Sequence, residues 1–143
     1  MIFNVRVYGI LVNEKKQILL SDEIIRGNFY TKFPGGGLEI GEGTRDCLRR
    51  EFLEEMNLQV EVGAHLYTTD FYQQSAFNPE HQIISIYYHV TAKETFDLHE
   101  INSSNQEQSE TFRFADLHQF SEEDVTLPID KVVARKLTEM VKR

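Results

Sequence analysis

The sequence predicts one mixed α+β domain over residues 1–143. Strand-like segments come first, a helix follows, further strand-like segments come next, and a second helix closes the chain. A length of 143 residues is enough for one hydrophobic core and short for two ordinary domains. We find no repeat, linker or low-complexity tract that would divide this order.

The N-terminal segments read as strands that precede a glycine-rich loop. Residues 3–12 alternate well enough for a strand with one buried face, and residues 13–17 form a polar turn. Residues 18–21, which begin with three apolar side chains, follow this turn as a second strand-like segment, so we expect a hairpin. The aromatic segment 29–33 then leads into the glycines.

The clearest helix is predicted from Thr44 to Met56. This stretch contains neither glycine nor proline, and Thr44 is a good N-cap residue. Leu48, Phe52 and Met56 recur every four residues and form one apolar stripe. The helix is therefore expected to be amphipathic, with this stripe facing a core.

The rest of the chain alternates between strand-like and polar segments before the closing helix. We predict strands at 58–62, 65–72, 83–92 and 111–117, a turn at 78–82, a loop at 98–110, and a helix within 127–143.

Composition narrows the class of protein. A hydrophobic fraction of 41% and a charged fraction of 27% are normal for a globular protein, and there is no run of apolar residues long enough for a membrane span. The net charge of -8 disfavours nucleic acid as a partner, because that affinity comes mainly from lysine and arginine. One cysteine and the lack of a signal-peptide pattern predict a cytoplasmic protein.

Three carboxylates share one edge of the predicted helix. At helical spacing Glu51, Glu54 and Glu55 fall within an arc of about 100°, next to the apolar stripe, and Arg50 can brace Glu54. An ordinary solvated acidic face is the alternative interpretation. The preceding loop favours a site, because its glycines allow close approach to a ligand and Glu42 adds a carboxylate. Oxygen ligands of this kind suit Mg²⁺ or Mn²⁺.

This stretch resembles the signature of the Nudix hydrolases, the Nudix box, over about residues 36–58. The matching positions are Gly36, Glu42, Arg50, Glu51, Phe52, Glu54, Glu55 and Leu58. The one departure is Asn57, where the family has glycine. Asparagine is the best substitute for glycine in a left-handed turn, so we expect Asn57 to end the helix. The resemblance implies the Nudix fold, an α/β/α sandwich with a central mixed β-sheet.

The resemblance also implies a Mg²⁺- or Mn²⁺-dependent pyrophosphohydrolase that cleaves a nucleoside diphosphate linked to another moiety. Glu51, Glu54, Glu55 and the Gly36 carbonyl would hold the metal, and Arg50 would orient Glu54. The ion would lower the pKa of a bound water, and a glutamate would take its proton. For that base the candidates are Glu54 and, on a later loop, Glu107 and Glu110, which are also candidate extra ligands.

The substrate side of the site is less defined. We expect Lys32, Gly37 and Glu39 to contact a small nucleotide substrate, although Lys32 can also be read as an ordinary solubilising charge. Two other functions remain open: a Nudix-like domain that senses a nucleotide without cleaving it, and an RNA 5′-end pyrophosphohydrolase, which would need a basic groove. A homodimer is the working hypothesis for the oligomeric state.

Overall fold

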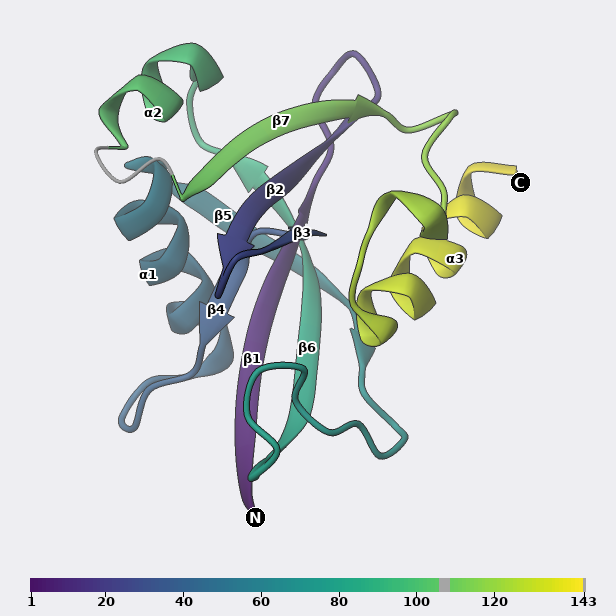
Figure 1. Cartoon of the computed structure of the whole chain (residues 1–143). Helices are drawn as coiled ribbons and strands as arrows, with labels where there is room; N and C mark the ends of the chain where they lie inside the picture. Colours follow the sequence, from purple (N-terminus) through teal and green to yellow (C-terminus); the bar gives the residue numbers. More distant parts are fainter. Residues whose placement is uncertain (106–108, 143) are drawn as a thin grey trace. The chain divides into compact units, whose positions relative to one another are not determined.

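The computed structural model describes residues 1–105 and 109–142. Its α-helices are α1 (Thr44–Met56), α2 (Leu98–Ser104) and α3 (Pro128–Lys142), with a 3₁₀ turn η1 (Glu122–Asp124) (Figure 1). Its strands are β1 (Ile2–Leu11), β2 (Gln17–Ile25), β3 (Asn28–Lys32), β4 (Gly35–Gly37), β5 (Val60–Thr68), β6 (His81–Ala92) and β7 (Glu110–Asp116).

The chain divides into two compact units, each with a sheet. The first unit comprises Met1–Ile10 and Gly35–Lys93, and the second comprises Leu11–Pro34 and Glu94–Arg143. The strands form a four-stranded sheet in the order β4-β1-β6-β5 and a three-stranded sheet in the order β3-β2-β7. The predicted α+β class is confirmed, whereas the single domain over 1–143 stays a prediction.

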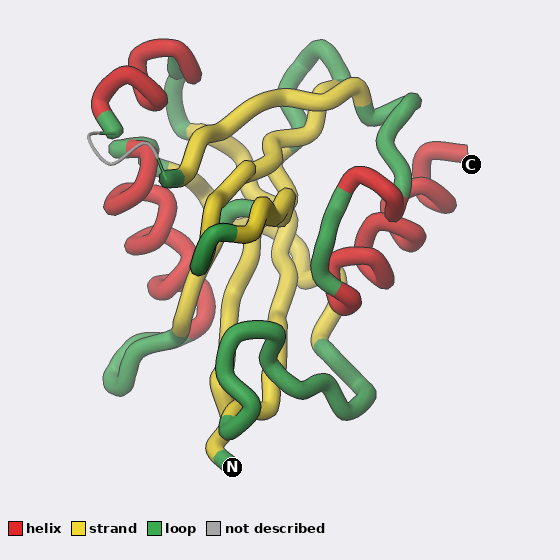
Figure 2. The backbone as a smooth tube through the Cα atoms, in the orientation of Figure 1, coloured by secondary structure: helices red, strands yellow, loops and turns green. Residues whose placement is uncertain are grey.

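In the first unit, the glycine segment forms a short strand rather than an irregular loop. β4 pairs antiparallel with β1, and this register sets Gly37 opposite Arg6 and Gly36 opposite Val7. Gly35 has a φ of 152°, and a Cβ there would overlap the Val7 carbonyl. Figure 2 shows the loop after β4 leading into α1. The pairing therefore fixes the start of the box against β1.

The α1 helix packs its apolar stripe into the core of the first unit. Leu48, Phe52 and Met56 are buried as predicted. A Cβ at Gly9 would lie 2.8 Å from the Phe52 ring, so glycine in β1 lets the helix come close. Burial of a side chain such as Phe52 contributes about 1.5–3 kcal/mol. This packing holds the neighbouring carboxylate edge of the helix in a fixed position.

The ends of α1 correct one expectation and confirm another. The N-cap is Gly43 rather than Thr44, and the Thr44 hydroxyl shares a hydrogen bond with the Tyr88 hydroxyl at 2.6 Å. Asn57 ends the helix in the left-handed conformation, with φ 51° and ψ 37°, and its backbone N–H bonds to the Leu53 carbonyl. Asparagine tolerates this conformation better than most residues.

In the second unit, β2 pairs with β3 and with β7, both antiparallel. The β2–β3 turn places Arg26 at φ 52° and Gly27 at φ 82°, as a tight two-residue hairpin requires. The hairpin expected between residues 3–12 and 18–21 is reduced to one bridge, Val12 to Ile18, because β1 and β2 pair with other strands.

The segment predicted as a loop at 98–110 contains α2. Asp97 caps this helix by accepting a hydrogen bond from the His99 backbone N–H. The Asn102 side chain both accepts from and donates to the Phe112 backbone, at 2.9 Å each, and so ties α2 to β7. A local cap and one side-chain anchor thus stabilise a short helix in a polar segment.

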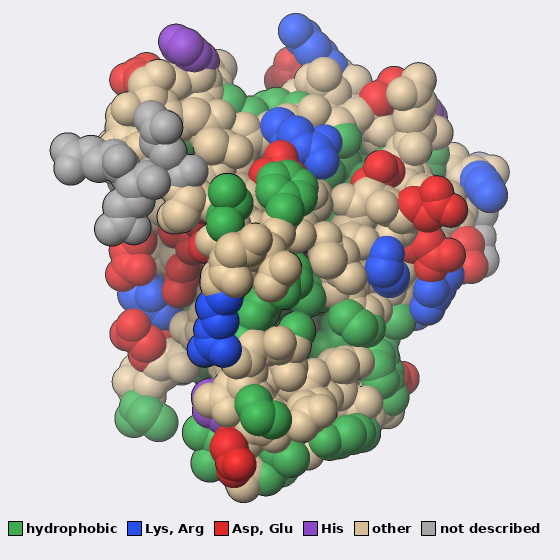
Figure 3. Space-filling model, viewed as in Figure 1, with side chains coloured by type: hydrophobic (Ala, Val, Ile, Leu, Met, Phe, Trp, Pro, Cys, Tyr) green, Lys and Arg blue, Asp and Glu red, His purple; other side chains and the backbone are tan. Residues whose placement is uncertain are grey.

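The surface carries charges of both signs. Figure 3 shows basic and acidic side chains interspersed over the face in view. Among the helices in the described part of the chain, none is long and apolar enough to cross a membrane.

Candidate active site

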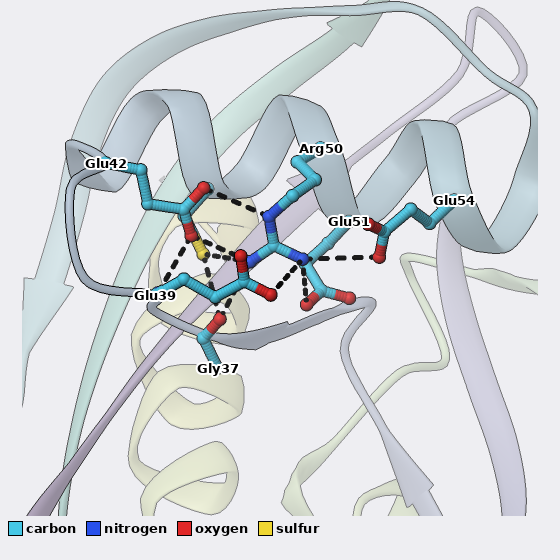
Figure 4. Close-up of polar contacts among 7 residues, drawn as sticks. Gly37, Glu39, Glu42, Arg50, Glu51 and Glu54 are labelled. Carbon is cyan, nitrogen blue, oxygen red and sulfur yellow. Dashed lines mark hydrogen bonds and ion pairs between the residues drawn. The ribbon is translucent and has the colours of Figure 1, made fainter.

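Arg50 lies at the centre of the box and joins the helix to the glycine segment (Figure 4). Its guanidinium donates two hydrogen bonds to Glu42, from Nε at 3.0 Å and from Nη2 at 2.7 Å. Nη1 donates to Glu51 at 3.0 Å and to Glu54 at 3.2 Å. Nη2 also donates to the Gly37 carbonyl at 2.9 Å. The prediction that Arg50 braces Glu54 agrees with this geometry, and the arginine holds further groups as well.

These contacts set the ionisation of the site. The hydrogen bond from Arg50, aided by one from the Glu39 backbone N–H, lowers the pKa of Glu42 to about 2. The same pairing with Glu42 raises the pKa of Arg50, so the guanidinium stays charged. The Glu39 carboxylate is 68% exposed and lies 3.7 Å from Arg50. The box is therefore a charged network at ordinary pH.

Gly36 provides the closest approach between helix and strand. A Cβ at Gly36 would overlap the Glu51 carboxylate, so only glycine leaves room for this side chain. The Glu51 side chain is 13% exposed, whereas that of Glu54 is 58% exposed. Of these two carboxylates, Glu54 is the more open to solvent and to a ligand.

The buried Cys47 lies beneath this network. Its thiol is fully buried and 3.5 Å from the Gly37 carbonyl. Burial raises the pKa of this thiol to about 12, and the neighbouring Glu42 acts in the same direction. Cys47 therefore serves packing and does not act as a nucleophile.

The oxygen donors of the box fit a hard divalent cation by their chemistry. Carboxylates on one helix edge and main chain beside Gly36 are ligands that Mg²⁺ or Mn²⁺ would accept. Across residues 1–105 and 109–142, however, no three His, Cys, Asp or Glu side chains are gathered as a metal site. Glu51 and Glu54 are instead paired with Arg50. Binding an ion would require them to exchange that partner for the metal, and their convergence with Glu55 stays a prediction.

Lys32 and Glu110 contact each other in the second unit. The Lys32 ammonium lies 3.2 Å from both the Glu23 and the Glu110 carboxylates, and Ser21 donates a hydrogen bond to Glu110. Lys32 is only 6% exposed. It is thus a buried ion-pair member rather than an exposed solubilising charge. Glu107, the other candidate on this segment, lies outside the described residues.

Sequence reasoning missed Arg6. It lies on β1 opposite Gly37, and its Nη1 would be 3.4 Å from a Cβ at that glycine. The pKa of Arg6 is raised first by the Tyr8 phenol, against the effect of burial, and further by the carboxylates of Glu51 and Glu55. No motif marks this residue, because only the β1–β4 register brings it to the box.

Comparison with known proteins decides the family. The model of the NUDIX domain matches residues 3–136. The chain belongs to the Nudix family. It is a Nudix-type hydrolase, an enzyme that acts on acid anhydrides in phosphorus-containing compounds. Nudix hydrolases generally use a divalent metal ion and act on small-molecule substrates. A search of curated proteins found no match.

Solved structures of Nudix proteins share this fold. A Nudix hydrolase from Nitrosomonas europaea has a TM-score of 0.72 and 18% identity, over 98% of this chain and 90% of that one. The MutT protein from Methanosarcina mazei Go1 has a TM-score of 0.71 and 17% identity, over 99% and 96%. A UDP-X diphosphatase has a TM-score of 0.64 and 17% identity, over 97% of this chain and 62% of that one. The predicted Nudix fold is confirmed.

Proposed function

We propose that this Nudix hydrolase is a Mg²⁺-dependent pyrophosphohydrolase that cleaves a nucleoside diphosphate linked to a second moiety. The observation that carries the proposal is the box itself, in which Arg50 gathers Glu42, Glu51 and Glu54 beside the glycine strand. The structural neighbour named a UDP-X diphosphatase supports this substrate class.

The side chains of the box divide the work by their contacts. Glu51, Glu54, Glu55 and the Gly36 carbonyl would hold Mg²⁺ or Mn²⁺, which supplies charge neutralisation of the diphosphate and a more acidic water. Arg50 orients Glu51 and Glu54 and, through Glu42, stays fully charged. Gly37 and Glu39 would line the substrate side, and at Gly37 the lack of a side chain would let a phosphate approach the main chain closely.

For the general base we favour Glu54. Its side chain is 58% exposed and lies on α1 beside Glu51, so a water molecule can reach its carboxylate. The Glu110 carboxylate accepts hydrogen bonds from Lys32 and Ser21. These bonds favour a role as a hydrogen-bond acceptor within the second unit over a role as the general base. Glu107 remains an alternative base.

We propose that the two units together make one Nudix domain, since the family model spans both. Contact of Lys32 with substrate, a cytoplasmic location and a homodimer stay predictions from the sequence.

Turnover of a nucleotide panel tests the function. Nucleoside diphosphate sugars, dinucleoside polyphosphates, ADP-ribose and nucleoside triphosphates would each be incubated with Mg²⁺ or Mn²⁺, and released phosphate or nucleotide measured. We expect at least one compound to be hydrolysed only with metal. Glu54→Gln should lower kcat by about 10²- to 10⁴-fold if it is the base.

Glu55→Gln should also lower turnover, whereas Glu61→Gln, an exposed glutamate on β5, should behave as wild type. If no compound is cleaved, or if the box variants hydrolyse as fast as wild type, the enzyme proposal is wrong. Tight nucleotide binding without cleavage would indicate the sensor instead, and selective cleavage of RNA 5′ ends would indicate RNA processing.

A further inference from the structure

Arg6 is held at one end and open at the other. Its Nε donates a hydrogen bond to the Tyr8 hydroxyl at 3.0 Å, and its guanidinium carbon lies 5.9 Å from the Tyr8 ring centre. Tyr8 is itself only 5% exposed, packed 5.3 Å from Tyr87 between ring centres. A buried aromatic pair therefore fixes the direction in which the guanidinium points.

The Nη end of the Arg6 guanidinium lies against the glycine strand β4. Arg6 is opposite Gly37 in the β1–β4 ladder, and Nη1 passes close to the Gly37 main chain. Any larger residue at that position would contact Nη1. The guanidinium thus lies beside β4, the strand that brings Gly36 against Glu51, where a phosphate would meet main chain without a side chain in the way.

Arg6 differs from Arg50 in what its donors do. The three nitrogens of Arg50 are used on Glu42, Glu51, Glu54 and the Gly37 carbonyl. Within the described part of the chain, Arg6 donates one hydrogen bond, from Nε to the Tyr8 hydroxyl, and neither of its Nη nitrogens forms a hydrogen bond or an ion pair. A guanidinium has five N–H donors, so the four on the two Nη nitrogens have no hydrogen-bond acceptor among the described residues.

The carboxylates of Glu51 and Glu55 place negative charge near Arg6. This charge favours an anion that binds together with a cation. Glu51 and Glu55 act on Arg6 electrostatically, and the ion pair of the Glu51 carboxylate is with Arg50 rather than with Arg6. If Arg6 were only a structural counter-ion, its guanidinium would be expected to contact a carboxylate directly. A planar fork beside open main chain instead matches two oxygens of a phosphoryl group.

We propose that Arg6 is a substrate-binding residue whose Nη groups donate to non-bridging oxygens of the substrate's diphosphate, and that Tyr8 is a positioning residue that acts through Arg6. The inference deepens the proposed function and rests on it for the substrate class. It concerns the diphosphate alone, so it holds whichever nucleoside or second moiety the substrate carries.

Equilibrium binding of inorganic pyrophosphate, measured by calorimetry with Mg²⁺ present, tests Arg6 directly. Arg6→Gln should raise the dissociation constant by about 10- to 100-fold, the range for a hydrogen bond between charged groups. Arg6→Lys keeps the positive charge but loses the guanidinium fork, so its dissociation constant for pyrophosphate should lie between those of Arg6→Gln and wild type. Arg49→Gln, an exposed arginine of α1 paired with Asp46, is the matched control and should bind as wild type.

Tyr8→Phe removes only the phenolic hydroxyl. It should weaken pyrophosphate binding by about 2- to 10-fold in the wild-type background and have no further effect in Arg6→Gln. An equal effect in both backgrounds would overturn the positioning role. In steady-state assays of any hydrolysed substrate, Arg6→Gln should raise KM more than it lowers kcat.

Two results would overturn the role of Arg6. One is unchanged pyrophosphate binding in Arg6→Gln or, if that variant does not fold, in Arg6→Lys. The other is wild type that binds no pyrophosphate with Mg²⁺. Failure of the hydrolase proposal gives a different result, in which pyrophosphate binding depends on Arg6 and no compound of the panel is cleaved.

Discussion

Each unit places a basic side chain among carboxylates, and the two clusters are built differently. In the first unit the Arg50 side chain is 22% exposed and contacts four glutamates, including Glu54, which is 58% exposed. In the second unit the Lys32 side chain is 7% exposed and lies 3.2 Å from Glu23 and Glu110, which are 26% and 12% exposed. A guanidinium fork distributes its donors over several acceptors, whereas an ammonium is a compact point charge.

The difference teaches which cluster can exchange partners. Surface ion pairs contribute about 0–1 kcal/mol, so Glu54 can leave Arg50 for another ligand at small cost. Removing one member of a buried pair leaves an uncompensated charge and costs far more. The Arg50 cluster is thus suited to binding and chemistry, and the Lys32 cluster to holding β2, β3 and β7 together.

Removal of the Lys32 charge should have the largest effect. Lys32→Met leaves Glu23 and Glu110 without their cation and should lower the free energy of unfolding by about 3–5 kcal/mol. Urea unfolding followed by circular dichroism measures it. Lys15→Met, in the exposed turn before β2, is the control and should change stability by less than about 0.5 kcal/mol.

The opposite result would break the comparison. If Lys32→Met unfolds like wild type but binds nucleotide weakly, the sequence-based prediction that Lys32 contacts substrate is supported and its structural role is not.

A methyl group at Gly36 tests the closest contact of the Arg50 cluster. Gly36→Ala overlaps the Glu51 carboxylate and should cost about 1–3 kcal/mol of stability as well as weaken Mn²⁺ binding. Urea unfolding and Mn²⁺ electron paramagnetic resonance measure the two effects. Gly43→Ala, where a Cβ would make only ordinary contact, should leave Mn²⁺ affinity unchanged. Wild-type Mn²⁺ affinity in Gly36→Ala would argue against Glu51 as a ligand.

Replacing the fork while keeping the charge sharpens the contrast further. Arg50→Lys cannot hold Glu42, Glu51 and Glu54 together, so metal affinity or activity should fall by about 10- to 100-fold with little loss of stability. Mn²⁺ titration and kcat measure this, with Arg49→Lys as the control. A large loss of stability without loss of metal affinity would make the Arg50 cluster structural, like that of Lys32.

The pH dependence of stability should show the smallest effect. The pKa of Glu42 is lowered from 4.5 to about 2 in the folded protein, so the unfolded chain binds this proton at higher pH. Its stabilisation is present above about pH 4.5 and is lost as pH falls towards 2. In urea unfolding between pH 6 and 2, Glu42→Gln should therefore show a shallower fall than wild type. An unchanged slope would contradict this pairing; Glu14→Gln, in an exposed turn, is the control.

Much of the box could be predicted because its information is local. The helix from Thr44 to Met56, its buried stripe and the left-handed Asn57 follow from short-range spacing and backbone preference. The error at the N-cap has a tertiary cause, because Tyr88 of β6 draws the Thr44 hydroxyl away from the helix end.

Long-range pairing set the limit of prediction. Arg6 reaches the box only through its register with Gly37, thirty-one positions along the chain, and nothing in the local sequence of β1 specifies that partner. In the same way, the carboxylate partners of Lys32 come from two other strands, so its sequence context gave no sign that Lys32 is buried. The α2 helix was missed because Asn102 is anchored on β7, not by an apolar stripe of its own.

The sealed position of Cys47, the single cysteine of the chain, makes the protein a convenient host for site-directed labels. Maleimides attack thiolates, and this thiol is shielded and, with its pKa raised to about 12, stays protonated at neutral pH. A cysteine introduced at a chosen surface position would then carry a single fluorescent label without a cysteine-free background, and the signal of that label would report nucleotide binding near the position.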